Sequence, residues 1–230
     1  MTQQNQEGLQ GLQPPSTELL RTFAPLQPVA GCYGIVVHQA DDLYALWEAW
    51  EREAWREACP IPYWSIVWPA AAVLGRYLLN NKEVAAGKTV LDLGCGGAAA
   101  SIAAAQAGAS RVIANDVDPI ALHIARLNIA ANSVAIEVCD RDLTIETIVP
   151  DFDLVLAGDL FYHGPTAPPI LAFLHRAKRN GARILIADAG RKYAPAVAVA
   201  VIARETVVVN KEVEGVTQRE VRLMELQGKD

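Results

Sequence analysis

The chain has 230 residues, of which 52% are hydrophobic and 20% are charged, and its formal net charge is −6. This composition is typical of a folded globular protein and excludes a disordered chain, and the length fits one large domain with a short extension. A negative protein has no general attraction to nucleic acid or to an anionic membrane surface, so neither is an expected partner.

Residues 1–28 are rich in Gln, Pro and Gly, and we expect a flexible tail there. The segment has neither the positive start nor the apolar core of a secretory signal, and no apolar run approaches the ~20 residues of a membrane span. The cysteines form no CxxC pair and the histidines form no HExxH motif. We therefore expect reduced thiols, a cytoplasmic location and no metal.

Residues 29–86 are expected to form an N-terminal extension that covers part of the site. A short strand pattern at 33–38 precedes a helix over 41–58, in which apolar residues recur every three or four positions. Asp41 or Asp42 suits the helix cap. The aromatic segment PYWSIVWP follows at 62–69, and its final proline suits the first turn of a helix that runs to about residue 80.

From residue 87 onward, strand patterns alternate with helix patterns. The expected strands cover residues 89–93, 111–115, 134–139, 152–157, 183–187, 206–210 and 218–226. The expected helices cover residues 98–107, 118–131, 168–179 and 195–203. No helix separates the last two strands, so one antiparallel strand should join an otherwise parallel sheet. The pattern predicts a doubly wound α/β fold.

The strongest local motif is VLDLGCGG at 90–97, a strand that runs into a glycine-rich turn before a helix. Such a turn presents backbone N–H groups at the carboxyl edge of the sheet. A dinucleotide site needs a third glycine, but Ala99 stands there. Asp92 before the first glycine is also foreign to that pattern. It suits a ligand with a cationic amino-acid end, such as S-adenosylmethionine (SAM).

Further acids follow the other strands. Asp116, 24 positions beyond Asp92, is placed to accept hydrogen bonds from ribose hydroxyls. Asp140 after the third strand is placed to accept from an adenine amino group, with Asp142 as the alternative. After the fourth strand, Asp159 and Tyr162 in DLFY suit an amine acceptor. Read alone, DLFY fits an acid-capped turn with a core Phe better than an amine site. The aromatic segment fits either a hydrophobic plug or a wall that excludes water.

Residues 62–191 resemble the seven-strand, SAM-dependent protein methyltransferases of the family 16 group. The matching pieces are PYWSIVWP, RYLLNN, GKTVLDLGCG, GASRVIANDVDPIA, LAGDLFY and ILIADAGR. The resemblance implies a class I methyltransferase (Rossmann-like) fold, with residues 87–230 as the SAM-binding domain. It also implies methyl transfer to a protein lysine, and the expected acceptor is the electron transfer flavoprotein β-subunit or a similar protein. The products would be the methylated lysine and S-adenosylhomocysteine, and we expect a monomer.

The resemblance also implies residue roles. The cofactor-binding set would be Trp68, Asp92, Gly94, Cys95, Gly96, Asp116 and Asp140. Asp92, Gly94 and Gly96 would line the methionine end of SAM, and Trp68 would close over the cofactor. Asp159 and Tyr162 would face the acceptor lysine as the catalytic pair.

Three departures from the family pattern leave the acceptor open: Ala70-Ala71 after the WP pair, ADAGR after the fifth strand, and RLM at 222–224. A small-molecule N-methyltransferase is the first alternative, because the same cofactor site serves both. An NAD-linked oxidoreductase is a second, against which Asp92 and Ala99 count. A non-catalytic module with this fold is a third, and the intact motif residues disfavour it.

Overall fold

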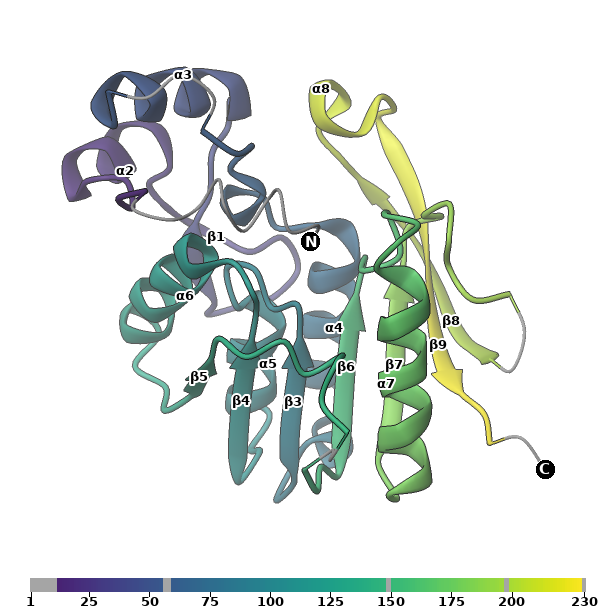
Figure 1. Ribbon diagram of the computed structural model, residues 1–230. Helices are drawn as coiled ribbons and strands as arrows, with labels where there is room; N and C mark the ends of the chain where they lie inside the picture. Colours follow the sequence, from purple (N-terminus) through teal and green to yellow (C-terminus); the bar gives the residue numbers. More distant parts are fainter. Residues whose placement is uncertain (1–11, 56–58, 148–149, 197–198, 229–230) are drawn as a thin grey trace.

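The computed structural model describes residues 12–55, 59–147, 150–196 and 199–228. Its centre is a seven-stranded sheet with the strand order β5-β4-β3-β6-β7-β9-β8 (Figure 1). The strands are β3 (Thr89–Leu93), β4 (Arg111–Asn115), β5 (Glu137–Cys139), β6 (Leu154–Gly158), β7 (Arg183–Asp188), β8 (Val199–Val208) and β9 (Gln218–Leu226). The neighbours from β5 to β7 are parallel, and β9 is antiparallel to both β7 and β8. This confirms the expected sheet.

The chain winds outward in two directions from the middle of this sheet. β3 pairs with β4 on one side and with β6 on the other, with Leu93 opposite Asn115 and Ala157. The carboxyl ends of β3 and β6 therefore meet where the winding direction changes. In an open α/β sheet this crevice is the ordinary place for a ligand.

Helices cover both faces of the sheet (Figure 1). The helices are α4 (Pro69–Asn80), α5 (Ala99–Gln106), α6 (Pro119–Ala131) and α7 (Ala167–Arg179). Side chains alternate along each strand: Val90 packs with α4 and α5, whereas Leu91 packs with α7. This alternation buries every strand residue from Val90 to Leu93 and makes a three-layer α/β/α structure.

An N-terminal extension lies above α6. It contains α2 (Thr17–Phe23), a small hairpin of β1 (Leu26–Pro28) and β2 (Val36–His38), and α3 (Leu43–Glu53). Asp42 caps α3, since its side chain accepts from the N–H of Ala45 at 2.9 Å. Pro69 begins α4 as expected. The expected strand at 33–38 and the helix at 41–58 are present with tighter bounds, and residues 56–58 lie outside the described residues.

The expected flexible tail is wrong for residues 12–28. Leu19 and Leu20 of α2 are buried at 7% and 2% exposure, in a cluster with Trp50 and Ile124. Ser16 caps the helix by accepting from the N–H of Leu19 at 3.2 Å. The polar composition of residues 1–28 gives no sign of the short amphipathic helix α2, because its leucines are buried only by contacts with distant residues. The remainder of the expected tail, residues 1–11, lies outside the described residues.

The expected helix at 195–203 is also wrong, because β8 begins at Val199 and runs to Val208. Most of its residues are β-branched or small, and the strand pairs with the whole of β9. As an edge strand, β8 is mostly exposed, so no alternation of apolar and polar residues identifies it. A short helix, α8 (Lys211–Glu214), forms the turn between β8 and β9.

α4 belongs to the main core rather than to a separate cover. Its buried Leu74 and Leu78 share one cluster with Leu154 of β6 and Leu223 of β9. The expected division after residue 86 therefore does not coincide with a division of the core. Among the helices that the structure describes, none combines the length and the apolar character needed to cross a membrane.

Candidate functional site

The glycine turn after β3 is open on one side and closely packed on the other. Gly94 has φ +68°, and a Cβ there would lie 2.4 Å from the Leu160 side chain. Gly96 has φ +51°, and a Cβ there would meet no described atom within 4 Å. The positive φ and the contact with Leu160 therefore favour glycine at position 94, whereas the space beside Gly96 is open to a ligand. Ala98, itself left-handed at φ +64°, precedes α5.

Asp116 at the end of β4 is tied to that turn. Its Oδ2 accepts a 2.9 Å hydrogen bond from the N–H of Gly96, and its Oδ1 accepts one of 3.1 Å from the N–H of Asp118. The carboxylate thus lies beside the glycine turn, as the sequence predicts for a ribose ligand. Asp118 separately caps α6 through the N–H of Ile120 at 2.8 Å.

Asp92 lies beneath the turn and is only 3% exposed. Ser101 of α5 donates a 2.6 Å hydrogen bond to its Oδ2. Burial raises the pKa of Asp92 to about 6, against the lowering effect of the Ser101 bonds. A buried carboxylate held in this way would gain from a nearby cation, and this is consistent with a role toward the amino-acid end of SAM.

Cys95 contributes backbone rather than thiol chemistry. Its N–H donates to the carbonyl of Asn115 at 2.9 Å, which joins the glycine turn to β4. Burial raises the pKa of the Cys95 thiol well above its ordinary value, so the neutral thiol is favoured.

Of the two acids proposed for adenine, Asp142 is already engaged. Its Oδ1 accepts from the N–H and the hydroxyl of Thr144 at 3.0 and 2.6 Å. Asp140 is exposed at the end of β5. This difference favours Asp140 for a ligand, and its contact with adenine remains a prediction.

Trp68, Tyr63 and Tyr162 form an aromatic edge beside these acids. Trp68 is the N-cap residue of α4, and its ring lies 5.5 Å from that of Tyr63. Its Nε1 donates to the Tyr63 carbonyl at 3.2 Å. Burial of the phenol raises the pKa of Tyr162, and Asp116 and Tyr63 are near enough to raise it further. The Tyr162 residue as a whole is nevertheless 62% exposed, so its ring is available to a partner.

The structure corrects the expected placement of Asp159, whose carboxylate does not face open space. Its Oδ2 accepts from the N–H of Ala70 at 3.1 Å, and its Oδ1 accepts from the N–H of Ala189 at 3.0 Å and from Arg191 Nε at 2.9 Å. The side chain is 4% exposed. In this arrangement Asp159 joins the start of α4 to the loop after β7, and of the predicted catalytic pair only Tyr162 is exposed.

Arg191, Asp188 and Glu214 are site residues that the sequence reasoning did not single out. Arg191 and Asp188 lie within ADAGR, a segment that the resemblance includes. Glu214 lies in α8, where sequence gives no signal, because its proximity depends on how the β8–β9 hairpin folds over the edge. Its carboxylate accepts from Arg191 at 3.0 and 2.6 Å.

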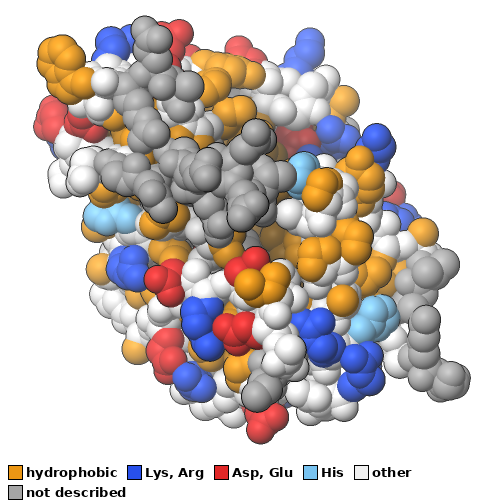
Figure 2. Space-filling model, in the orientation of Figure 1, with side chains coloured by type: hydrophobic (Ala, Val, Ile, Leu, Met, Phe, Trp, Pro, Cys, Tyr) orange, Lys and Arg blue, Asp and Glu red, His pale blue; other side chains and the backbone are white. Residues whose placement is uncertain are grey.

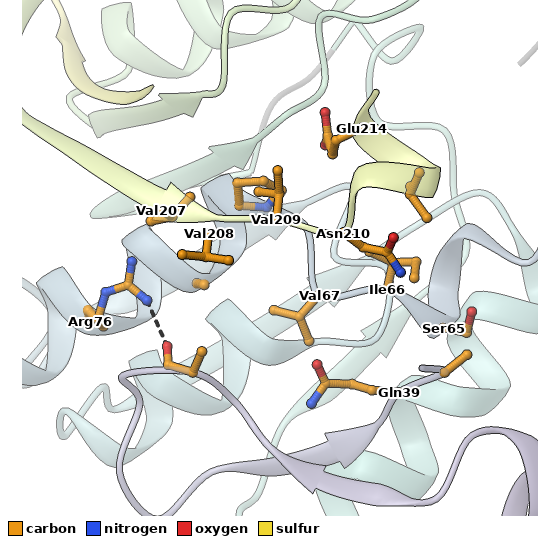
Figure 3. A pocket seen from close by; sticks show the side chains of 15 residues that line it. Gln39, Ser65, Ile66, Val67, Arg76, Val207, Val208, Val209, Asn210 and Glu214 are labelled. Atoms are coloured by element: carbon orange, nitrogen blue, oxygen red, sulfur yellow. Dashed lines mark hydrogen bonds between the residues drawn. The ribbon is translucent and has the colours of Figure 1, made fainter. Parts of the chain in front are cut away.

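A separate cavity of about 230 Å³ lies between the extension, α4 and the end of β8 (Figure 3). Valines supply much of its lining, including Val67, Val207 and Val209. Its polar side chains are bonded within the chain: Arg76 donates to the Ala30 carbonyl at 2.7 Å, for example. The cavity is therefore distinct from the glycine turn and Asp116.

The backbone at Gly96, the Asp116 carboxylate and the buried Asp92 fit SAM in kind. The open turn at Gly96 and the Asp116 carboxylate would hold the nucleoside, and the Asp92 carboxylate would balance a cation. Gly94, Gly96, Asp92, Asp116 and Trp68 lie along the carboxyl edge as predicted, and their contact with SAM remains a prediction.

Comparisons with known proteins agree with the resemblance read from the sequence. The family described as ribosomal protein L11 methyltransferase (PrmA) matches residues 75–161. The chain is 46% identical over 133 residues to the electron transfer flavoprotein beta subunit lysine methyltransferase of Danio rerio, covering 57% of this chain and 52% of that protein. The Homo sapiens protein of the same name is 40% identical over 148 residues, covering 62% and 54%. The chain thus matches about half the length of these curated relatives.

Solved structures support the fold. Magnesium protoporphyrin IX methyltransferase from Synechocystis PCC 6803, solved with bound S-adenosylhomocysteine, superimposes with a TM-score of 0.54 at 15% identity. The superposition covers 81% of this chain and 95% of that one. The seven-strand sheet with its single antiparallel strand is thus the class I methyltransferase fold, and the expected fold class is confirmed.

Proposed function

We propose that this chain transfers a methyl group from SAM to the side-chain amine of a lysine in a protein acceptor. The acceptor class that the relatives' names support is the electron transfer flavoprotein β-subunit or a protein with a similar lysine-bearing surface.

One observation carries the proposal: the glycine turn bonded to Asp116 lies at the change of winding direction, next to an exposed aromatic edge. Gly96 and Asp116 supply the nucleoside side of the site, and Trp68 and Tyr162 supply a surface for the acceptor. The turn after β6 packs directly on the turn after β3, since Leu160 fills the space that a Cβ at Gly94 would need. Cofactor and acceptor groups are thereby held close together.

SAM, when bound, supplies an activated methyl group on a sulfonium, so the protein mainly provides alignment and a dry surrounding. A lysine with a pKa near 10.4 is neutral in only about one molecule in a thousand near pH 7. The aromatic edge of Tyr63, Trp68 and Tyr162 disfavours the ammonium form and lowers the pKa of an entering lysine. The proton leaves to water before attack, because the Asp159 carboxylate is already held by two backbone N–H groups and by Arg191.

The charge distribution also suits a protein acceptor. In the face shown in Figure 2, acidic and basic side chains are interspersed, and hydrophobic side chains gather beside them. The described part of this face shows no continuous basic band of the kind that tracks a nucleic-acid backbone. On this face, a nucleic acid is therefore a poorer candidate than a protein.

Methylation of the purified acceptor tests the proposal. The chain is incubated with labelled SAM and the electron transfer flavoprotein β-subunit, and mass spectrometry locates any added methyl groups. A β-subunit in which the methylated lysines are changed to arginine is the control. Label in small amines rather than in protein would favour the small-molecule alternative, and calorimetric heat with NAD but not with SAM would overturn the cofactor assignment.

The cytoplasmic location and the monomeric state also remain proposals. Cell fractionation tests the first, and light scattering of the purified chain tests the second.

A further inference from the structure

Arg191, in the loop after β7, holds several parts of the carboxyl edge together. Its Nε donates to Asp159 at 2.9 Å, and its terminal nitrogens donate to the two oxygens of Glu214 at 3.0 and 2.6 Å. Its backbone N–H donates to Asp188 at 2.8 Å. The guanidinium carbon also lies 5.2 Å from the centre of the Trp68 ring. One side chain, 14% exposed, thus connects the turn after β6, the start of α4 and α8.

Two carboxylates of this group, Asp159 and Glu214, each have a guanidinium partner. Arg219 Nε donates to Glu214 Oε2 at 3.0 Å, so two guanidiniums face the carboxylates of Asp159 and Glu214. Burial alone would raise the pKa of Glu214, but the hydrogen bonds from Arg191 and Arg219 outweigh it and the pKa is lowered. Buried charges are held firmly when each has such partners, and removing one member leaves the others uncompensated.

Resting on the proposed methyl transfer, we infer that Arg191 is a positioning residue that fixes the Trp68 ring at the acceptor edge. Trp68 is held from two sides. Its ring stacks near the guanidinium, and its backbone begins the helix whose second residue, Ala70, donates to Asp159. Glu214, at the end of α8 in Figure 3, holds Arg191 in turn. The β8–β9 hairpin therefore takes part in shaping the acceptor edge, although it lies far along the chain from Trp68.

Another arrangement would have the acceptor lysine displace Arg191 from Asp159 and Trp68. That exchange would break the Nε bond to Asp159 and leave Glu214 with Arg219 alone. It would also require a lysine to enter a place where Asp159 is 4% exposed. The contacts therefore favour a fixed Arg191 over one that is displaced in each turnover.

The chain offers a matched control in Arg183. This arginine begins β7 and donates through two nitrogens to Glu225 of β9 at 3.1 and 2.9 Å. Arg183→Met therefore removes an ion pair between β7 and β9. This pair lies at the end of β7 away from the site, whereas Arg191 follows the other end of β7. Arg191→Met and Glu214→Gln are compared with it, and Arg191→Lys keeps the charge without the planar fork.

Two measurements are made on the full chain. Steady-state methylation of the acceptor protein separates kcat from KM, and calorimetry gives the affinity for S-adenosylhomocysteine. We expect Arg191→Met to lower kcat at least tenfold while its cofactor affinity stays within about threefold of wild type. Glu214→Gln should lower kcat less. Arg191→Lys should recover part of the kcat that Arg191→Met loses. Arg183→Met should keep wild-type kcat. Equal kcat losses in the two methionine variants, or a parallel loss of cofactor affinity in Arg191→Met, would overturn the inference.

A third measurement does not depend on turnover. Acrylamide quenching of tryptophan fluorescence is recorded for each variant with and without the additional substitution Trp68→Phe. The difference between the two measures how accessible the Trp68 ring is to the quencher. This difference should increase in Arg191→Met and stay unchanged in Arg183→Met. If the wild-type protein methylates no acceptor, the proposed function fails, and the quenching result still decides the inference: unchanged Trp68 accessibility in Arg191→Met would overturn it.

Discussion

The carboxylate of Asp116 accepts a 2.9 Å hydrogen bond from the backbone N–H of Gly96. This bond joins the end of β4 to the glycine turn after β3, so the two parts of the predicted nucleoside site support each other. A substitution of Asp116 would therefore remove the predicted ribose contact and also loosen the turn that is predicted to make the other contacts.

Asp116→Ala should weaken SAM binding by roughly 1–3 kcal/mol, the ordinary cost of losing hydrogen bonds to a charged acceptor. Calorimetry with SAM measures the change. Asp142→Ala is the control, because the Asp142 carboxylate is engaged within its own turn by Thr144. Equal affinities for wild type and Asp116→Ala would remove Asp116 from the cofactor site.

Asp92→Asn should stabilise the ligand-free protein while weakening SAM binding. Burial raises the pKa of Asp92 from 3.8 to about 6, so the folded protein binds more protons than the unfolded chain between these values. Wild-type stability should accordingly fall as the pH rises from 4 to 6 and stay low above that. The neutral amide escapes this penalty, so we expect a gain of roughly 1–3 kcal/mol at pH 7 that shrinks toward pH 4.

Urea unfolding at pH 4 and pH 7 measures the stability of Asp92→Asn, and calorimetry measures its SAM affinity. Ser101→Ala is a useful companion variant, because it removes the 2.6 Å hydrogen bond to the carboxylate while leaving the charge. A variant less stable than wild type at pH 7, with unchanged SAM affinity, would show that Asp92 serves the fold alone.

The sequence predicts the parts of the fold that are set by local pattern. Buried strands such as β3 and β6 are continuous apolar runs, and Pro69 and Asp118 mark helix starts with their own chemistry. The expected strand at 206–210 overlaps only the end of β8, and the rest of β8 escaped prediction because an exposed edge strand carries no alternation. α2 escaped because its two leucines become a signal only once Trp50 lies against them.

Some residues of the site could be predicted from local pattern in the same way, and others could not. Gly94, Gly96 and Asp116 follow strands directly, so the topology alone brings them to one edge. The partner of Asp159 could not be predicted, because Arg191 is 32 positions away and reaches it only after β7 is placed beside β6. Glu214 depends on a further step, the folding of the β8–β9 hairpin.

Removal of residues 1–27 should destabilise the protein strongly. The truncation deletes the buried Leu19 and Leu20 and the Ala24 carbonyl that contacts His38 Nδ1 at 2.7 Å. Burial of a leucine side chain contributes roughly 1.5–3 kcal/mol, so we expect a loss of at least ~3 kcal/mol. A chain that begins at Leu12 keeps every described contact and is the control. If the chain that lacks residues 1–27 melted at the wild-type temperature, α2 would be dispensable for the fold.

Tyr162→Ala should lower methyl transfer at least tenfold, whereas Tyr162→Phe should retain most of it. The exposed ring is the feature that the acceptor edge requires, because an aromatic surface excludes water from the entering lysine and disfavours its ammonium form. Steady-state rates with the acceptor protein distinguish the variants. A Phe variant as inactive as the Ala variant would instead assign the role to the hydroxyl.

Asp159→Asn tests whether this buried acid serves the fold or the acceptor. Asp159 has φ +53°, a left-handed conformation that Asn tolerates, so this substitution changes the carboxylate without straining the backbone. The amide nitrogen of Asn would face either the N–H of Ala70 or the donors at Ala189 and Arg191, and one of these contacts would be lost. We expect a destabilisation of about 2–4 kcal/mol, because the Arg191 guanidinium stays buried but loses the negative charge of the Asp159 carboxylate.

Thermal unfolding and methyl-transfer rates of the same samples decide between the two roles. Asp159→Ala should be less stable still, since alanine at a positive φ adds strain. Asp142→Asn, in an ordinary turn, should melt close to wild type. If Asp159→Asn melts like wild type yet loses turnover with SAM affinity intact, Asp159 faces the acceptor lysine, as the family resemblance implies. A lowered melting temperature, with turnover partly restored when the assay is cooled, would assign it to the support of α4 and Arg191.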